Sequence, residues 1–95
     1  MSEKKLLDWS RRADRDADAI YDYIAIDNRD AAQQVMAELR KTVNGLVEFP
    51  LIGREGEIAG TRELVVPHYP YTIVYRLNAA KIRIVAVLHQ SRQYP

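Results

Sequence analysis

Residues 71–89 read YTIVYRLNAAKIRIVAVLH. Apolar and other side chains alternate over residues 71–77 and again over 81–89, which is the period of a β-strand. Residues 78–80 alone separate the two runs, so we expect an antiparallel hairpin. The alternation assigns the core-facing positions to Ile73, Tyr75 and Leu77 on the first strand and to Ile82, Ile84, Ala86 and Leu88 on the second.

Two further segments have strand character. Residues 61–66 form a third predicted strand, which Pro67 closes. Residues 5–9 form a shorter apolar run, which predicts an opening strand too short to be stable alone. Residues 50–60 contain one proline and three glycines and predict an irregular loop.

Two amphipathic helices are predicted between the opening strand and this loop. The first covers residues 10–27, with Ser10 as its N-cap. The second is expected to take Asp30 as its N-cap and to end before Pro50. Because the connection is short, the helices should form an antiparallel hairpin.

The order β-α-α-β-β-β predicts an α+β fold, with the helical hairpin packed on a mainly antiparallel sheet. One face of that sheet should contact the helices, and the other should gather arginines. A chain of 95 residues has room for one core, so residues 1–95 are expected to form a single domain.

Composition excludes several classes of function. The chain has no cysteine and two histidines, which argues against disulfides, thiolate chemistry and a structural metal site. No apolar run approaches the roughly 18 residues of a membrane span, and the N-terminus lacks the apolar segment of a secretion signal. We therefore expect a cytoplasmic protein without cofactor, metal or membrane contact.

The charge is polarised along the chain. Residues 1–48 carry 8 Lys and Arg against 10 Asp and Glu, whereas residues 49–95 carry 6 against 3. The basic half suits an acidic partner or nucleic acid, although it is less cationic than a dedicated DNA-binding domain.

Familiar catalytic and binding motifs are weak. Asp14, Asp18 and Asp22 share a helix face and could gather a hard cation, but neighbouring arginines and the helix dipole explain them better. Residues 53–56, GREG, lack the lysine and remaining glycines of a phosphate-binding loop, so a turn is expected.

The remaining candidates form one group of cationic and aromatic residues near the exposed sheet face: Arg54, Arg62, Arg76, His89, Arg92 and Tyr94. They fit metal-free RNA cleavage, with His89 or Glu63 as base and Arg76 or Arg92 stabilising the phosphorane. They fit equally the anchoring of a protein partner. The plain structural alternative is a solvated sheet face on which Arg76 pairs with Glu63.

Local strings in this order resemble the RelE/ParE toxins of bacterial type II toxin-antitoxin modules. The strings are Trp9-Ser10 with Ala13, Asp16, Ile20, Tyr23 and Ile24; Leu46, Pro50 and Gly53-Arg54; Gly60 to Leu64; Tyr71 to Arg76; and Val87 to His89 with Arg92. The resemblance spans nearly the whole chain. It implies a plasmid- or chromosome-borne toxin that a cognate antitoxin holds inactive in a hetero-oligomer.

The resemblance also bears on mechanism. RelE-like members, which cut mRNA on the ribosome, usually carry an arginine directly after the aromatic that matches Tyr71, and this chain has Thr72 there. The tail from Leu88 to Arg92 looks more like ParE proteins, which inhibit DNA gyrase without catalysis. A gyrase-binding toxin is therefore favoured, and a ribosome-dependent endoribonuclease using His89, Arg76, Arg92 and Arg62 is the alternative.

Two surfaces are expected to carry the function. Four apolar or aromatic residues that cannot all face the core are candidates for antitoxin binding: Tyr21, Tyr23, Ile26 and Phe49. The target surface is expected near the C-terminus, so deletion of residues 91–95 should abolish toxicity with little loss of stability.

Overall fold

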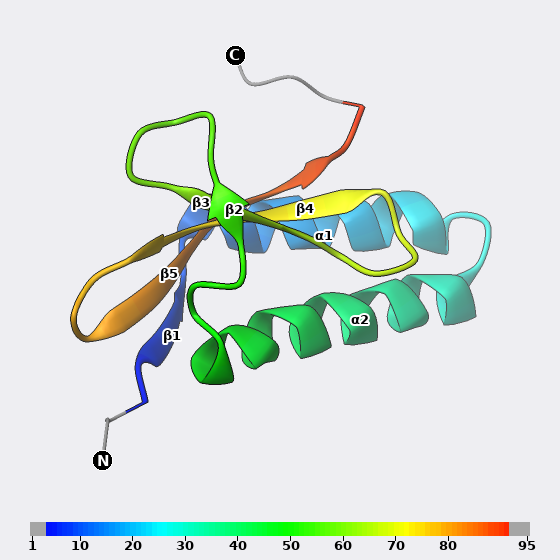
Figure 1. Ribbon diagram of the computed structural model, residues 1–95. Coiled ribbons are helices and arrows are strands. Elements are labelled where there is room, and N and C mark those ends of the chain that lie inside the picture. The colour runs from blue at the N-terminus through cyan, green and yellow to red at the C-terminus, as the bar shows by residue number, and fades with distance from the viewer. Residues whose placement is uncertain (1–3, 92–95) are drawn as a thin grey trace.

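The computed structural model describes residues 4–91. Its elements in chain order are β1 (Leu6–Trp9), α1 (Arg11–Ala25), α2 (Arg29–Glu48), β2 (Arg54–Glu55), β3 (Arg62–Val65), β4 (Tyr71–Leu77) and β5 (Lys81–His89). The strands form one sheet in the order β1-β5-β4-β3-β2, and β1 pairs in parallel with β5 while all other pairs are antiparallel (Figure 1). The predicted α+β fold is confirmed, with one addition: β2 lies inside the segment that we expected to be irregular.

Both helices begin at capped positions. Ser10 Oγ accepts a hydrogen bond from the Ala13 N–H at 3.0 Å and donates to the Val85 carbonyl at 2.9 Å, which joins the start of α1 to β5. The N-cap of α2 is Asn28, whose Oδ1 accepts from the Ala31 N–H at 3.0 Å. The prediction of Asp30 as N-cap was therefore wrong, and Asp30 instead places a carboxylate in the first turn, where the helix dipole favours it.

The core lies between the helical hairpin and one face of the sheet. Figure 1 shows α1 and α2 running antiparallel, and their buried side chains meet those of β4 and β5 in one cluster. Its largest fully buried members are Tyr75, Leu39, Leu46, Ile73, Ile82 and Ile84. None of the helices within residues 4–91 is long and apolar enough to cross a bilayer.

A β-bulge in β5 changes which side chains face the core. Tyr75 lies opposite Ile84 but Val74 lies opposite Ala86, so Val85 is an extra residue without a partner on β4. Beyond the bulge, Val87 faces the helices and packs in the core cluster. The predicted core face was right for Ile82 and Ile84 and wrong for Ala86 and Leu88, which lie on the opposite face.

The outer face of the sheet, away from the helices, is only partly polar. Thr72, Val74 and Ala86 are buried there. The segment that joins β2 to β3 arches over the side of the sheet away from α2 (Figure 1). The Arg76 guanidinium ties this segment down by donating to the Ala59 carbonyl at 3.2 Å, beside Gly60, which has a φ of 81°.

Candidate functional site

Two of the candidate cations, Arg54 and Arg76, lie on the outer face of the sheet. Register places Arg54 opposite Glu63 and Arg76 opposite Arg83, so these side chains share that face. Arg54 pairs with Glu63 at 3.0 Å, and Arg83 pairs with Asp8 of the neighbouring β1. The predicted Arg76–Glu63 pair is not among the ion pairs of residues 4–91, and the Arg76 guanidinium donates to the Ala59 carbonyl instead. We call Arg54, Arg76 and Arg83 the outer-face cations.

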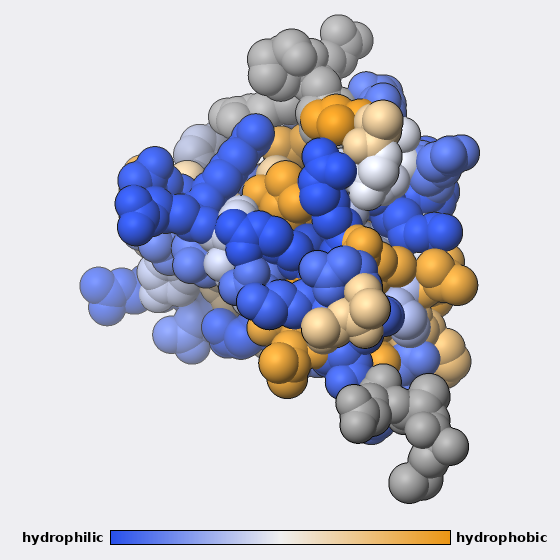
Figure 2. Space-filling model, turned by 90° about the vertical axis from the view of Figure 1, so that its left-hand side faces the viewer, coloured by the Kyte–Doolittle hydropathy of each residue, from blue (hydrophilic) through white to orange (hydrophobic). Residues whose placement is uncertain are grey.

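Arg83 was not among the candidates predicted from the sequence, but it lies directly opposite Arg76 in the β4–β5 hairpin. The short turn at residues 78–80 sets this pairing, so the sequence could have identified Arg83. Figure 2 shows that the adjoining end of the molecule, around the β4–β5 turn and the β2–β3 segment, carries mostly hydrophilic side chains with a few apolar ones between them.

Arg62 does not belong to the outer-face cations. It lies opposite Tyr75, on the helix side of the sheet, and its Nη1 donates to the carbonyls of Gly53 at 2.8 Å and Leu51 at 3.4 Å. The Tyr75 hydroxyl holds the same loop, because it accepts from the Gly53 N–H and donates to the Pro50 carbonyl, both at 2.9 Å. Arg62 and Tyr75 therefore fix the loop at residues 50–53.

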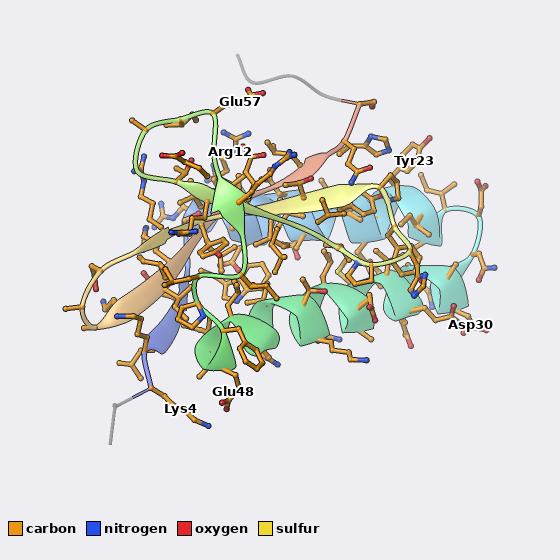
Figure 3. The ribbon with its side chains drawn as sticks, in the orientation of Figure 1. Lys4, Arg12, Tyr23, Asp30, Glu48 and Glu57 are labelled. Atoms are coloured by element: carbon orange, nitrogen blue, oxygen red, sulfur yellow. The ribbon has the colours of Figure 1, made fainter. Side chains whose placement is uncertain are left out.

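The hydrogen-bonded loop exposes its apolar side chains. Phe49, Pro50, Leu51 and Ile52 line an open hollow of about 340 Å³, and the Phe49 side chain is 65% exposed. Figure 3 places Tyr23 and Glu48, the residue before Phe49, at opposite ends of the helical hairpin. Phe49 thus lies about 30 Å along α2 from the end where Tyr23 lies, given a rise of about 1.5 Å per residue over its 20 residues.

The four candidate antitoxin contacts are therefore not one patch. Tyr23 and Ile26 are strongly exposed near the end of α1, Tyr21 is half-buried, and Phe49 belongs to the hollow at the other end of the hairpin.

A second hollow runs between α1 and the ends of β4 and β5. It has a volume of about 570 Å³, and we call it the aromatic groove. Its lining residues are Asp16, Ala19, Ile20, Tyr23, Tyr71, Val87, His89 and Ser91. The groove exists because β1 pairs only with residues 81–84 of β5, so that α1 lies beside the remainder of that strand.

The bulge at Val85 brings His89 into the aromatic groove. Its imidazole meets the ring of Tyr71 edge-on, with centroids 5.5 Å apart and planes at 89°. His89 Nδ1 accepts from the Ser91 N–H at 3.1 Å and lies 2.7 Å from Ser91 Oγ. The prediction that His89 shares a face with Arg76 was wrong, because the extra residue reverses the alternation.

The aromatic groove also contains the carboxylate of Asp16, which a backbone hydrogen bond fixes in position. Asp16 Oδ2 accepts from the Val87 N–H at 2.9 Å and lies 3.5 Å from Arg12 Nε. Burial raises the pKa of Tyr71 above its ordinary value of 10.0, and the charge that Tyr23 would carry raises it further. The Tyr71 phenol is thus neutral at physiological pH.

Comparison with known proteins identifies the family of the chain. Residues 7–94 match the family described as the ParE toxin of the type II toxin-antitoxin system parDE. The chain belongs to the ParE toxin family.

Relatives and a solved structure resemble this ParE-family toxin over most of its length. It is 42% identical to Y4kP of Sinorhizobium fredii, whose name marks it as a candidate toxin, over all of this chain and 97% of that protein. It is 38% identical to toxin RelE2 of Caulobacter vibrioides, over 88% of this chain and 93% of the other. A structure of the chromosomal ParDE toxin-antitoxin system from P. aeruginosa superposes with a TM-score of 0.81 at 27% identity, covering 90% of this chain and 96% of that one.

The ParE-family fold separates the residues of the nuclease hypothesis. Arg62 and His89 lie opposite Tyr75 and Tyr71, four residues and about 14 Å apart along β4, and Arg76 points to the other face of the sheet. Arg92 and Tyr94 lie outside the described residues. Within residues 4–91, no three His, Asp or Glu side chains are placed to hold a metal ion, and Asp14, Asp18 and Asp22 are exposed.

Proposed function

We propose that this ParE-family toxin arrests growth by binding DNA gyrase in the cytoplasm without catalysing a reaction, and that a cognate antitoxin neutralises it. The observation that carries the proposal is the separation of His89, Arg62 and Arg76. A metal-free ribonuclease needs a base and a charge-stabilising cation within hydrogen-bonding reach of one phosphate. These three side chains do not meet such a requirement.

Thr72 supports the same proposal. Its side chain lies on the outer face between Val65 and Leu88, and the residue is only 8% exposed. Even an uncharged hydroxyl at this position has little access to an RNA phosphate. The site at which RelE-like nucleases carry an arginine is thus closed in this chain.

The outer-face cations are the surface that we assign to gyrase. Arg54 and Arg76 are exposed and are held in fixed positions by Glu63 and by the Ala59 carbonyl. Arginine is favoured at the energetically important positions of protein interfaces, and pre-ordering lowers the entropic cost of binding.

The ribonuclease stays as the second candidate because one relative carries the name toxin RelE2. The antitoxin partner rests on the P. aeruginosa structure, whose title names a toxin-antitoxin system. We assign the antitoxin to Tyr21, Tyr23 and Ile26 at one end of the helical hairpin and to Phe49 at the other.

The test compares two activities of the purified toxin. It should inhibit gyrase supercoiling at micromolar or lower concentration and should leave mRNA intact on translating ribosomes. Arg76→Ala should weaken inhibition, whereas Arg40→Ala, which removes the same charge from the exposed side of α2, should not. Cleaved mRNA with unaffected gyrase would replace this proposal by the ribonuclease.

A further inference from the structure

The aromatic groove has one fixed charge. Among its lining residues, all of which the structure describes, Asp16 is the single carboxylate and no Lys or Arg is present. The carboxylate is held in place because its Oδ2 accepts the Val87 N–H. No hydrogen bond within residues 4–91 reaches its Oδ1, which leaves an acceptor available to a ligand.

Arg12, which already pairs with Asp16, competes only weakly with an incoming ligand for this carboxylate. Arg12 lies one helical turn away, its side chain is 55% exposed, and its Nε is 3.5 Å from the carboxylate. Ion pairs of this kind stabilise a helix little, so another guanidinium can displace or share the contact. The Asp16 side chain is 24% exposed, and solvent screens it less than it screens the carboxylates on the outer side of α1.

The walls suit a flat cation. Tyr23 is 77% exposed and forms the open side of the groove, while Tyr71 and His89 lie at the end formed by the strands. Ring faces attract guanidinium groups, and the aliphatic stem of arginine packs on apolar side chains such as Ile20 and Val87. A phosphate or other anion would instead be repelled by the negative charge of the Asp16 carboxylate.

We propose that the aromatic groove is a recognition site for an arginine side chain of a protein partner, in which the guanidinium pairs with Asp16 and stacks on Tyr23. The site does not depend on gyrase being the target. It identifies the chemistry of one contact that a protein partner makes with α1 and β5.

The probe is N-acetyl-arginine methylamide, titrated into the full-length toxin and followed by amide NMR shifts. Ala19, Tyr23, Val87 and Ser91 should move together, and the citrulline analogue, which has the same shape without the charge, should bind about tenfold more weakly or worse. Equal binding of the two analogues would overturn the proposal, as would tighter binding of adenosine monophosphate.

Four variants, two of them controls, locate the contact. Asp16→Asn keeps an oxygen for the Val87 N–H and should reduce affinity for the arginine analogue about tenfold, while Asp18→Asn, on the other side of α1, should not change it. Tyr23→Ala should also weaken binding, and Tyr23→Phe, which retains the ring face, should bind like the parent chain. Because Tyr23 is exposed, its variants remain informative if Asp16→Asn fails to fold, and full binding by Tyr23→Ala would refute the site.

Discussion

Each end of β4 carries a tyrosine, and the hydroxyl groups of the two tyrosines differ in their hydrogen bonding. Tyr75 and Tyr71 lie on the same face of one strand, and burial raises the pKa of both. Hydrogen bonds within the protein fully engage the Tyr75 hydroxyl, which accepts from the Gly53 N–H and donates to the Pro50 carbonyl. The Tyr71 hydroxyl makes no hydrogen bond within residues 4–91, and its residue lines the aromatic groove.

The Tyr75 hydroxyl therefore contributes to stability, whereas the Tyr71 end of the strand forms part of the recognition site that we propose. Side chains whose polar atoms are satisfied inside the protein hold the loop at residues 50–53. At the other end of the same strand, the Tyr71 ring is buried in the core cluster, but its hydroxyl makes no hydrogen bond within residues 4–91 and the residue lines the aromatic groove.

The largest expected effect comes from removing the buried ring. Tyr75→Ala should lower the free energy of unfolding by about 3–5 kcal/mol, because it leaves a cavity beneath the helices and frees the loop. Urea unfolding measures this loss. Tyr23→Ala, at an exposed ring, should stay within about 0.5 kcal/mol. Similar losses in the two variants would remove the distinction between the buried Tyr75 ring and the exposed Tyr23 ring of the aromatic groove.

Removing only the hydroxyls sharpens the contrast. Tyr75→Phe should cost about 1–3 kcal/mol, because the Gly53 N–H and the Pro50 carbonyl lose a buried partner. Tyr71→Phe should cost less than about 0.5 kcal/mol, because no hydrogen bond is lost within the described residues. The same unfolding assay tests both, and a greater loss for Tyr71→Phe would reverse the comparison.

Antitoxin binding offers a separate comparison of the two ends of the helical hairpin. Tyr23→Ala and Phe49→Ala should each weaken binding about tenfold, and their effects should add because Tyr23 lies near the end of α1 whereas Phe49 follows the far end of α2. Isothermal titration calorimetry with the purified antitoxin measures both. Val65→Ala, an exposed apolar residue on the outer face, serves as control. If Phe49→Ala binds the antitoxin with unchanged affinity, the antitoxin contacts only the end of the hairpin that contains Tyr23.

The smallest expected effect is a loss of stability at alkaline pH. A phenol whose folded-state pKa is raised favours folding fully below its ordinary pKa of 10.0, and this contribution is lost as pH rises through that value toward the higher folded-state pKa. Stability should therefore fall as pH rises above 10.0, and more gradually in Tyr75→Phe. Urea midpoints measured across this range test the sign, and a midpoint that rises with pH would contradict it.

Local sequence determined most of the secondary structure. The ranges 71–77 and 81–89 predicted β4 and β5 to the residue, and Ser10 was identified as the cap of α1. These features depend on side-chain alternation and on hydrogen bonds within one turn of the chain, so a single segment contains the necessary information.

Only the tertiary structure decided which of these side chains form sites. The bulge at Val85 exists only in the pairing of β5 with β4, and the Val85 carbonyl accepts a hydrogen bond from Ser10. The bulge moves His89 from the face of Arg76 to the aromatic groove. Arg62 has the sequence character of a surface cation, yet the loop at residues 50–53 occupies its guanidinium. Both outcomes depend on partners distant in the chain, because an alternating pattern predicts that a strand has two faces, whereas the register and the neighbouring loops determine what each face contacts.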